Sequence, residues 1–337
     1  MLFALSLLIL FGLIAAPGAA SAAASDAALL WWTRVLPSLL PYLVASSLLL
    51  GSGVLSRLKG RASMLLLPLG LLGGYPVGAR IAGTLYQKGA LRLSDAQNVA
   101  ALCNLPNPVF LVSVVSAGLF RDQRTALPLL LGIYGTSLLS LIPLSRVRIS
   151  AVRASESPAL SDALPKAIAD GVRAILNIGG CLVFASVLGA LLGATGVFRL
   201  FGAGEMVVRA VLLGLFEMTS GVSGLAALPF SLPLRLALTA FLLQFGGVSV
   251  LFQSASALPL PLPRYCLIRL IGAMLAAIAV YLFTPLFCPD TVVPTMASGA
   301  EMLQNSFDLL TVILSCTFCL LFVFVFTPRS RHQKRTR

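Results

Sequence analysis

Long apolar runs alternate with short polar stretches along most of the chain. A run of roughly 18 apolar residues marks a spanning helix. Six runs near or above that length read as continuous spans, at residues 2–16, 35–55, 125–143, 171–194, 264–286 and 307–327. Composition agrees, because 58% of the residues are hydrophobic and only 10% are charged. The pattern predicts an all-α polytopic membrane protein.

Four further apolar segments are interrupted by glycine, proline or polar residues. Segments 94–119 and 232–257 are long enough to span the membrane but are broken midway. Segments 63–90 and 205–230 are broken and carry charge at both ends, so each is predicted to dip into the membrane and return. The prediction is therefore about eight transmembrane helices plus two re-entrant helical hairpins.

The order of these segments repeats with opposite orientation. Each half reads as a span, a broken hairpin, a broken span and a span, which is the inverted-topology repeat of many secondary transporters. We divide the chain into five parts. An N-terminal helix with an external loop (1–33) precedes Gate-like repeat 1 (34–144), and a cytoplasmic linker (145–168) leads to Gate-like repeat 2, which is inverted (169–288). The C-terminal region (289–337) comprises an external loop, a final transmembrane helix and a basic cytoplasmic tail.

The first apolar run allows two interpretations. Residues 17–24 are rich in alanine, which resembles the small-residue cleavage site of a signal peptide. The start of the chain lacks the usual positive charge, which favours an uncleaved first helix.

Basic residues are placed as the positive-inside rule requires. The net charge is +13, but the lysines and arginines fall between apolar runs and in the tail, so we predict no nucleic-acid partner. Arg57, Lys59 and Arg61 mark one cytoplasmic loop, whereas loop 287–306 has no basic residue and is predicted to be external. Arg121 and Arg124 are the main exceptions.

The sequence shows few of the residue patterns that enzymes use for catalysis. The single histidine, His332, lies in the tail, and the six cysteines fall mostly within apolar runs. No P-loop and no paired carboxylates occur in the apolar segments. We therefore predict a non-enzyme with no metal and no cofactor, and leave a coupling proton or sodium ion open.

Four breaks fall at matching places in the two halves. They are Gly73–Gly78, Cys103–Pro108, Glu217–Gly221 and Phe245–Ser249. Unpaired backbone groups at membrane depth cost several kcal/mol each unless protein, water or ligand satisfies them. New helices are expected near residues 76, 106–108 and 247, with Thr219 or Ser220 capping a fourth. Four helix N-termini at the middle of the membrane would suit an anion. The competing interpretation is that these residues merely kink packed helices.

The predicted substrate site takes its residues from all four breaks. The candidates are Gly74, Tyr75, Pro76, Arg80, Asn104, Asn107, Glu217, Thr219, Ser220, Gly246, Gly247, Ser249 and Gln253. Arg80 could pair with an anionic substrate or reach the cytoplasmic surface. Glu217 could carry a coupling proton, bind a cation, or pair with Arg80 or Arg209.

Three stretches carry a family resemblance. The stretch "GGYPVGARIAGTLYQKGALRLSDAQNVAALCNLPNPVFLVSVV" resembles the YlbJ (SpoVV) family of sporulation integral membrane proteins, and "FEMTSG" and "FGGVSVLFQ" resemble that family's second-half motifs. The wider group comprises the nucleoside-recognition, or Gate-domain, membrane proteins. The resemblance covers about residues 30–290. It implies a bacterial cell-membrane protein of endospore formation that moves dipicolinic acid across the outer forespore membrane.

The sequence therefore leaves three hypotheses for the function of the chain. The first is transport of a small organic anion, with dipicolinate as the candidate that the resemblance implies. The second is a nucleoside-type transporter, which would favour neutral hydrogen-bonding groups over Arg80. The third is a non-transporting assembly factor for spore maturation. The sequence leaves the substrate, the coupling ion and the oligomeric state open.

Overall fold

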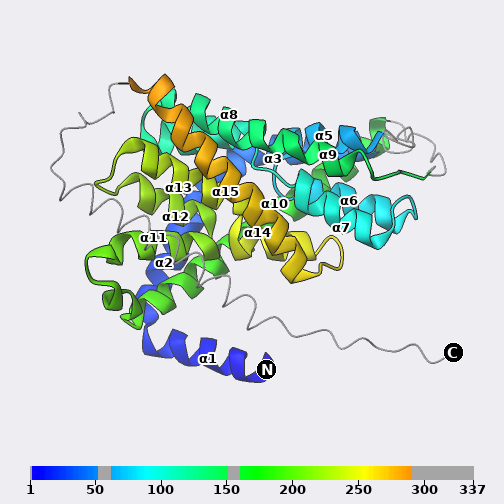
Figure 1. Ribbon diagram of the computed structural model, residues 1–337. Coiled ribbons are helices and arrows are strands. Elements are labelled where there is room, and N and C mark those ends of the chain that lie inside the picture. Colours follow the sequence, from blue (N-terminus) through cyan, green and yellow to red (C-terminus); the bar gives the residue numbers. More distant parts are fainter. Residues whose placement is uncertain (1, 52–61, 151–159, 290–337) are drawn as a thin grey trace.

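The computed structural model describes residues 2–51, 62–150 and 160–289. These residues form helices joined by short loops, and no β-strand occurs among them (Figure 1). Five helical stretches in the described part are long and apolar enough to cross a membrane: Pro17–Leu49, Gln123–Leu144, Ser161–Ala194, Leu232–Ala255 and Leu262–Phe287. An all-helical membrane protein is thus confirmed. The predicted final span, the loop before it and the basic tail lie outside the described residues.

The N-terminal region differs from the prediction of a helix followed by an external loop. Helix α1 (Leu2–Ala15) is short, and α2 (Pro17–Leu30) occupies the expected loop. It continues through η1 (Trp31–Val35) into α3 (Leu36–Gly51). The reason is local, because alanine is the best helix former and Pro17 stands at the first turn, where proline is well tolerated. The second span therefore begins well before residue 35.

The first half contains two pairs of short helices at the places where a re-entrant hairpin and a broken span are predicted. After η2 (Ala62–Leu65), helices α5 (Leu66–Gly73) and α6 (Val77–Gln87) form the hairpin. Helix α7 (Leu93–Cys103) and the π-helical η3 (Phe110–Phe120) are the two parts of the broken span. After η4 (Gln123–Thr125), helix α8 (Ala126–Ser137) continues through η5 (Leu138–Ser140) into α9 (Leu141–Leu144).

The second half repeats that order. Helix α10 (Leu160–Ala194) begins earlier than expected, inside the predicted linker 145–168. The 3₁₀ segment η6 (Val197–Gly204) follows it, and α11 (Glu205–Phe216) and α12 (Met218–Ala226) form the second hairpin. Helices α13 (Leu232–Phe245) and α14 (Gly247–Ala255) are the two parts of the second broken span, and α15 (Leu262–Phe287) completes the half.

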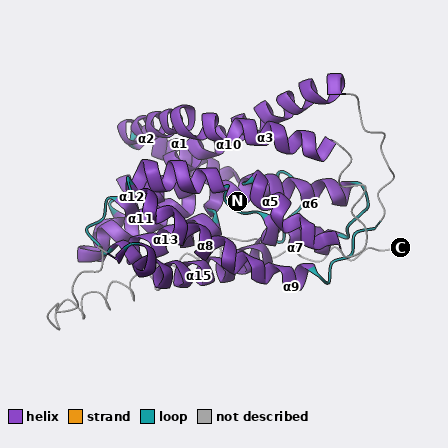
Figure 2. Cartoon of the chain, turned by 90° about the horizontal axis from the view of Figure 1, so that it is seen from above, coloured by secondary structure: helices purple, strands orange, loops and turns teal. Residues whose placement is uncertain are grey.

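Two hydrophobic cores hold the helices together. One gathers residues of the first hairpin, α7, α3 and α10, and the other gathers residues of the second hairpin, α8, α13 and α15. The hairpins α5–α6 and α11–α12 lie at opposite ends of the molecule (Figure 2). Each core draws residues from both halves of the chain, so the two halves pack against each other.

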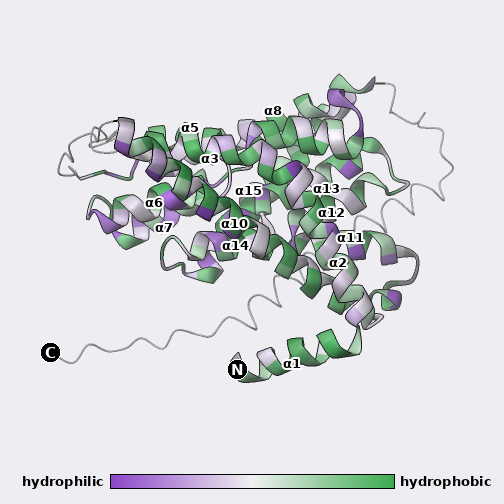
Figure 3. Cartoon of the chain, turned by 180° about the vertical axis from the view of Figure 1, so that it is seen from behind, coloured by the Kyte–Doolittle hydropathy of each residue, from purple (hydrophilic) through white to green (hydrophobic). Residues whose placement is uncertain are grey.

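The outer helices present apolar faces to their surroundings (Figure 3). Along α15 the exposed residues Leu267, Ile271, Leu275, Ile278 and Leu282 recur every three or four positions, which is one face of a helix. A broad exposed apolar surface is unfavourable in water and is the surface that lipid covers. The fold therefore fits a bilayer.

Candidate functional site

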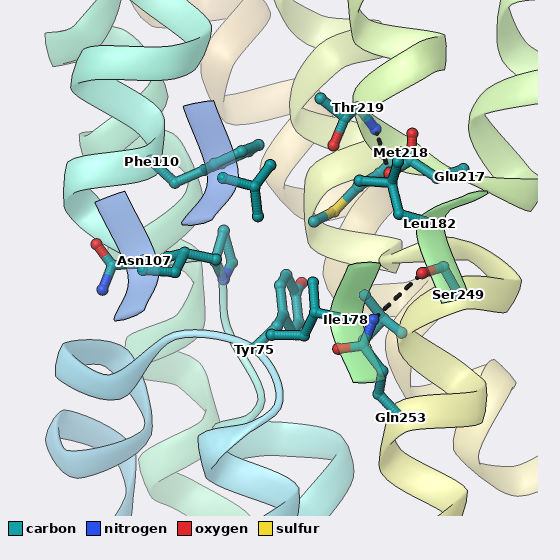
Figure 4. A pocket seen from close by; sticks show the side chains of 14 residues that line it. Tyr75, Asn107, Phe110, Ile178, Leu182, Glu217, Met218, Thr219, Ser249 and Gln253 are labelled. Carbon is teal, nitrogen blue, oxygen red and sulfur yellow. Dashed lines mark hydrogen bonds between the residues drawn. The ribbon is translucent and has the colours of Figure 1, made fainter. Parts of the chain in front are cut away.

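The four predicted breaks meet at one small buried cavity (Figure 4). It has a volume of about 40 Å³. Each break supplies part of the wall: Tyr75 from the first, Pro106 and Asn107 from the second, Glu217 to Thr219 from the third, and Ser249 from the fourth, with Val250 and Gln253 following it in α14. Apolar side chains, among them Phe110 and Ile178, complete it. Residues from both halves therefore enclose a common space.

Helices begin beside this cavity at all four breaks. Helix α6 begins at Val77, α12 at Met218 and α14 at Gly247, and another helical stretch begins at Pro108 and continues into η3. These are the helix starts that the glycines, prolines and polar residues predicted. Because a helix N-terminus carries partial positive charge, four of them make the surroundings of the cavity favourable for negative charge. At two of them the side chains of Asn107 and Glu217 already accept hydrogen bonds from first-turn amides.

The first break brings the hairpin tip against the second break. Gly74 has φ of +70°, and a Cβ there would lie 2.7 Å from the Cβ of Asn107, so only glycine fits. The Asn107 side chain donates to the carbonyl of Leu72 at 3.2 Å and accepts from the amide of Val109 at 2.7 Å. Asn107 thus caps the new helix and holds the hairpin tip. The peptide bond between Tyr75 and Pro76 is cis.

The second break is tied to α14 of the second half and to α8 of the first half. Nδ2 of Asn104 donates to Oγ of Ser254 in α14 at 2.9 Å, and the Tyr134 hydroxyl donates to the carbonyl of Pro106 at 2.8 Å. Asn104 is fully buried but does not line the cavity. Its role in the structure is to join the two broken spans.

Glu217 caps helix α12. Its carboxylate accepts hydrogen bonds from the backbone amides of Thr219 at 2.9 Å and Ser220 at 2.7 Å, and its side chain is only 2% exposed. The prediction that Thr219 or Ser220 caps this helix is therefore wrong. A carboxylate satisfies both amides at once and also balances the helix dipole. Among the described residues Glu217 forms no ion pair with Arg80 or Arg209.

The fourth break is built on two glycines. Gly246 and Gly247 have φ of +87° and +69°, values that side chains other than glycine rarely adopt. Further along α14, Nε2 of Gln253 donates to Oγ of Ser249 at 3.2 Å, while its Oε1 is buried without a hydrogen-bond partner. That oxygen is free to accept a hydrogen bond from a molecule in the cavity.

Six of the thirteen predicted residues line the cavity: Tyr75, Asn107, Glu217, Thr219, Ser249 and Gln253. The others stand beside it in the chain or in the structure without lining it. Ser220, for example, contacts Ser186 of α10, with 3.3 Å between the two hydroxyl oxygens.

Arg80 does not line the cavity. Its Nη2 donates to Oγ of Ser47 in α3 at 3.4 Å, and its Nη1 is buried without a hydrogen bond. The residue is one turn past the break in α6, but its side chain points to α3. Because α6 turns this face toward α3, spacing along the sequence could not place Arg80 relative to the cavity.

Arg269 is the functional candidate that the sequence interpretation missed. It is 2% exposed and donates to the Tyr75 hydroxyl and to the carbonyls of Phe245 and Asn104. Its guanidinium also lies 5.3 Å from the centre of the Tyr75 ring. One buried cation therefore joins three of the four breaks. An arginine inside the apolar run 264–286 was the signal that could have found it, since intramembrane charges are costly and rarely incidental.

The charges around the cavity are unevenly placed. Glu217 is its acidic lining residue, and no lysine or arginine lines it within the described part of the chain. Arg269 lies behind Tyr75, where its charge faces the carbonyls that end α7 and α13. The cavity wall thus combines helix N-termini, one carboxylate and neutral polar side chains.

Comparison with known proteins identifies a relative over nearly the whole chain. The sporulation integral membrane protein YlbJ of Bacillus subtilis (strain 168) is 26% identical over 373 aligned positions, which cover 93% of this chain and 91% of that protein. This similarity supports the YlbJ family assignment. A membrane role follows from YlbJ and from the apolar helices. No family model matches the chain, and no solved structure matches it.

Proposed function

We propose that this chain is a membrane transporter of a small organic anion, which binds at the cavity between the four breaks. The observation that carries the proposal is the convergence of four helix starts from two similar halves on one buried cavity. Broken helices at a repeat interface are the usual construction of a transporter site. The proposal assigns no catalytic step to the chain.

Dipicolinate is the first substrate to test, because the YlbJ family resemblance implies it and because helix N-termini favour carboxylates. The present cavity of about 40 Å³ has room for only a few water molecules. Transport therefore requires the cavity to widen. In this proposal Glu217 fixes the start of α12 beside the substrate, and the coupling ion, a proton or sodium, is left open. The membrane would be the outer forespore membrane, with the C-terminal tail in the cytoplasm.

A nucleoside-type substrate is the second candidate. The position of Arg80 away from the cavity favours it, as do the neutral hydrogen-bonding side chains of Asn107, Ser249 and Gln253. The free Oε1 of Gln253 needs a donor, which a nucleoside supplies and a dipicolinate dianion does not.

Uptake by proteoliposomes containing the full chain separates these proposals. Labelled dipicolinate should enter, and unlabelled uridine should not compete with it. Replacing Gln253 by Leu should slow dipicolinate uptake about tenfold, because it removes the second Nε2 hydrogen, which Ser249 does not take and a carboxylate can accept, at a cost of about 1–2 kcal/mol. Gln123→Leu, at an exposed position outside the cavity, is the matched control. Competition by uridine would favour the nucleoside-type site instead.

Absence of uptake of either solute would overturn the transport proposal. In that case, normal spore maturation by a chain carrying Glu217→Ala would favour the assembly-factor alternative. Equal uptake by the wild type and by a Glu217→Ala, Gln253→Leu double variant would disprove the proposed binding site. It would not contradict transport by the chain.

A further inference from the structure

A second, larger cavity lies on the other side of the Tyr75–Arg269 pair. Its volume is about 370 Å³, and it lies between α7, the α8–α9 stretch, α13 and α15. Tyr75 lines the central cavity, and Arg269, which donates to its hydroxyl, lines the second one. The two cavities are therefore neighbours separated by this pair of side chains.

The charge lining the second cavity is opposite to that of the central one. Arg264 and Arg269 line it, and no aspartate or glutamate does within the described part of the chain. Arg269 has no carboxylate partner among the described residues, and its contacts are carbonyls and one hydroxyl. Arg264 is exposed and has neither a hydrogen bond nor an ion pair there. Two positive charges therefore face one cavity without an anion.

Neutral hydrogen-bonding groups extend this positive surface. Asn98 and Ser140 line the cavity and form no hydrogen bond within the described part of the chain, so both can donate. Gln244, 6% exposed, donates from Nε2 to Oγ of Ser137 at 3.3 Å; its Oε1 has no partner and, as an acceptor, would be satisfied by a water that accompanies the anion and not by the anion itself. A buried polar atom without a partner in a polar cavity indicates a missing water or ligand.

The arginines are spaced along the cavity from its mouth to its depth. Arg264 is in the first turn of α15, and Arg269 lies five residues further, roughly 7–8 Å along the axis. An anion that enters near the start of α15 would meet the solvated Arg264 first and the buried Arg269 next. Such a sequence of charges guides an anion inward, because each step gains attraction as hydration is lost.

We propose that the second cavity is an anion-binding subsite, which receives a carboxylate or phosphate group at Arg264 before it reaches the Tyr75–Arg269 pair. Two sources share this chemistry: a small soluble carboxylate on its way to the central cavity, or the headgroup of an anionic phospholipid. The use of dipicolinate as a probe rests on the proposed function, whereas the subsite itself rests on the two arginines and the cavity.

Binding of labelled dipicolinate to the purified full chain tests the soluble source. Arg264→Gln should weaken binding about tenfold, the usual effect of losing one charge-assisted hydrogen bond. Arg199→Gln is the control, because Arg199 is exposed and lines neither cavity. In a Ser140→Cys chain, dipicolinate should slow labelling by the anionic thiol reagent sulfonatoethyl methanethiosulfonate. The wild-type chain gives the background of its native cysteines.

Native mass spectrometry in phosphatidylglycerol-containing detergent micelles tests the lipid source. The subsite would be supported and assigned to lipid if the Arg264→Gln protein lost its bound phosphatidylglycerol while the Arg199→Gln protein kept it. Dipicolinate binding would then be the same in both variants. If neither dipicolinate binding nor lipid retention distinguishes the two variants, the subsite is overturned. If the Ser140→Cys chain is protected but proteoliposomes show no uptake, the subsite stands and the transport proposal fails.

Discussion

Arg269 of α15 donates a hydrogen bond to the hydroxyl of Tyr75, which lies at the tip of the first hairpin. The same hydroxyl donates to the carbonyl of Leu243 in α13 at 2.6 Å. One phenol oxygen therefore connects the hairpin of the first half with two helices of the second half. The pair also stands between a cavity with one carboxylate and a cavity with two arginines.

Tyr75→Phe is expected to destabilise the fold. The change keeps the ring but removes a buried oxygen, so the carbonyl of Leu243 and one N–H of Arg269 lose their partner, at a cost of about 1–3 kcal/mol. Thermal unfolding in detergent, followed by intrinsic fluorescence, measures this as a lower midpoint. Tyr86→Phe is the control, because the Tyr86 hydroxyl has no hydrogen bond within the described residues. Equal midpoints for the two variants would contradict the connection.

Replacement of Glu217 by Gln should weaken the start of α12. Glutamine keeps one side-chain oxygen where the carboxylate offers two to the amides of Thr219 and Ser220. Losses at helix caps are about 0.5–2 kcal/mol. The thermal midpoint should fall, and hydrogen exchange should rise at the first amides of α12. Glu205→Gln, in the first turn of α11, changes the same charge without removing a side-chain cap. A similar effect from both variants would mean that charge alone, and not the cap, matters.

The four breaks were predictable from the sequence because they depend on local backbone chemistry. Gly74, Gly246 and Gly247 adopt positive φ, and Pro76 cannot continue a helix. The positions of the long side chains were not predictable, since they depend on which helices become neighbours. Arg80 turns to Ser47 in α3, whereas Arg269, inside an apparently continuous span, reaches three breaks. The helical start of α2 was missed because small apolar residues suit both a signal-peptide boundary and a helix.

Gly78→Ala should disrupt the contact between the first hairpin and the second break. A Cβ at residue 78 would lie 2.2 Å from the carbonyl oxygen of Cys103, which is backbone and cannot move aside cheaply. Overpacking of this kind costs about 1–3 kcal/mol or more. We expect a lower yield of monodisperse protein by size-exclusion chromatography and a lower unfolding midpoint. Gly180→Ala is the matched control, because a Cβ there meets no atom within 4 Å. The close approach would be disproved if Gly78→Ala behaved like Gly180→Ala.

The predicted opposite orientation of the two halves can be checked by labelling from the two sides of the membrane. Arg92, before α7, is predicted to be cytoplasmic, and Arg199, in η6 before the second hairpin, is predicted to be external. Both side chains are exposed, so cysteines at these positions should react readily. In intact cells a membrane-impermeant maleimide should label Arg199→Cys and not Arg92→Cys, and permeabilisation should restore labelling of the latter. The unsubstituted chain controls for native cysteines, of which Cys103, Cys266 and Cys288 are buried. Labelling of both variants from the same side would refute the inverted repeat. Residues 92 and 199 each lie beside one hairpin, and the hairpins of two halves with opposite orientation must begin on opposite faces of the membrane.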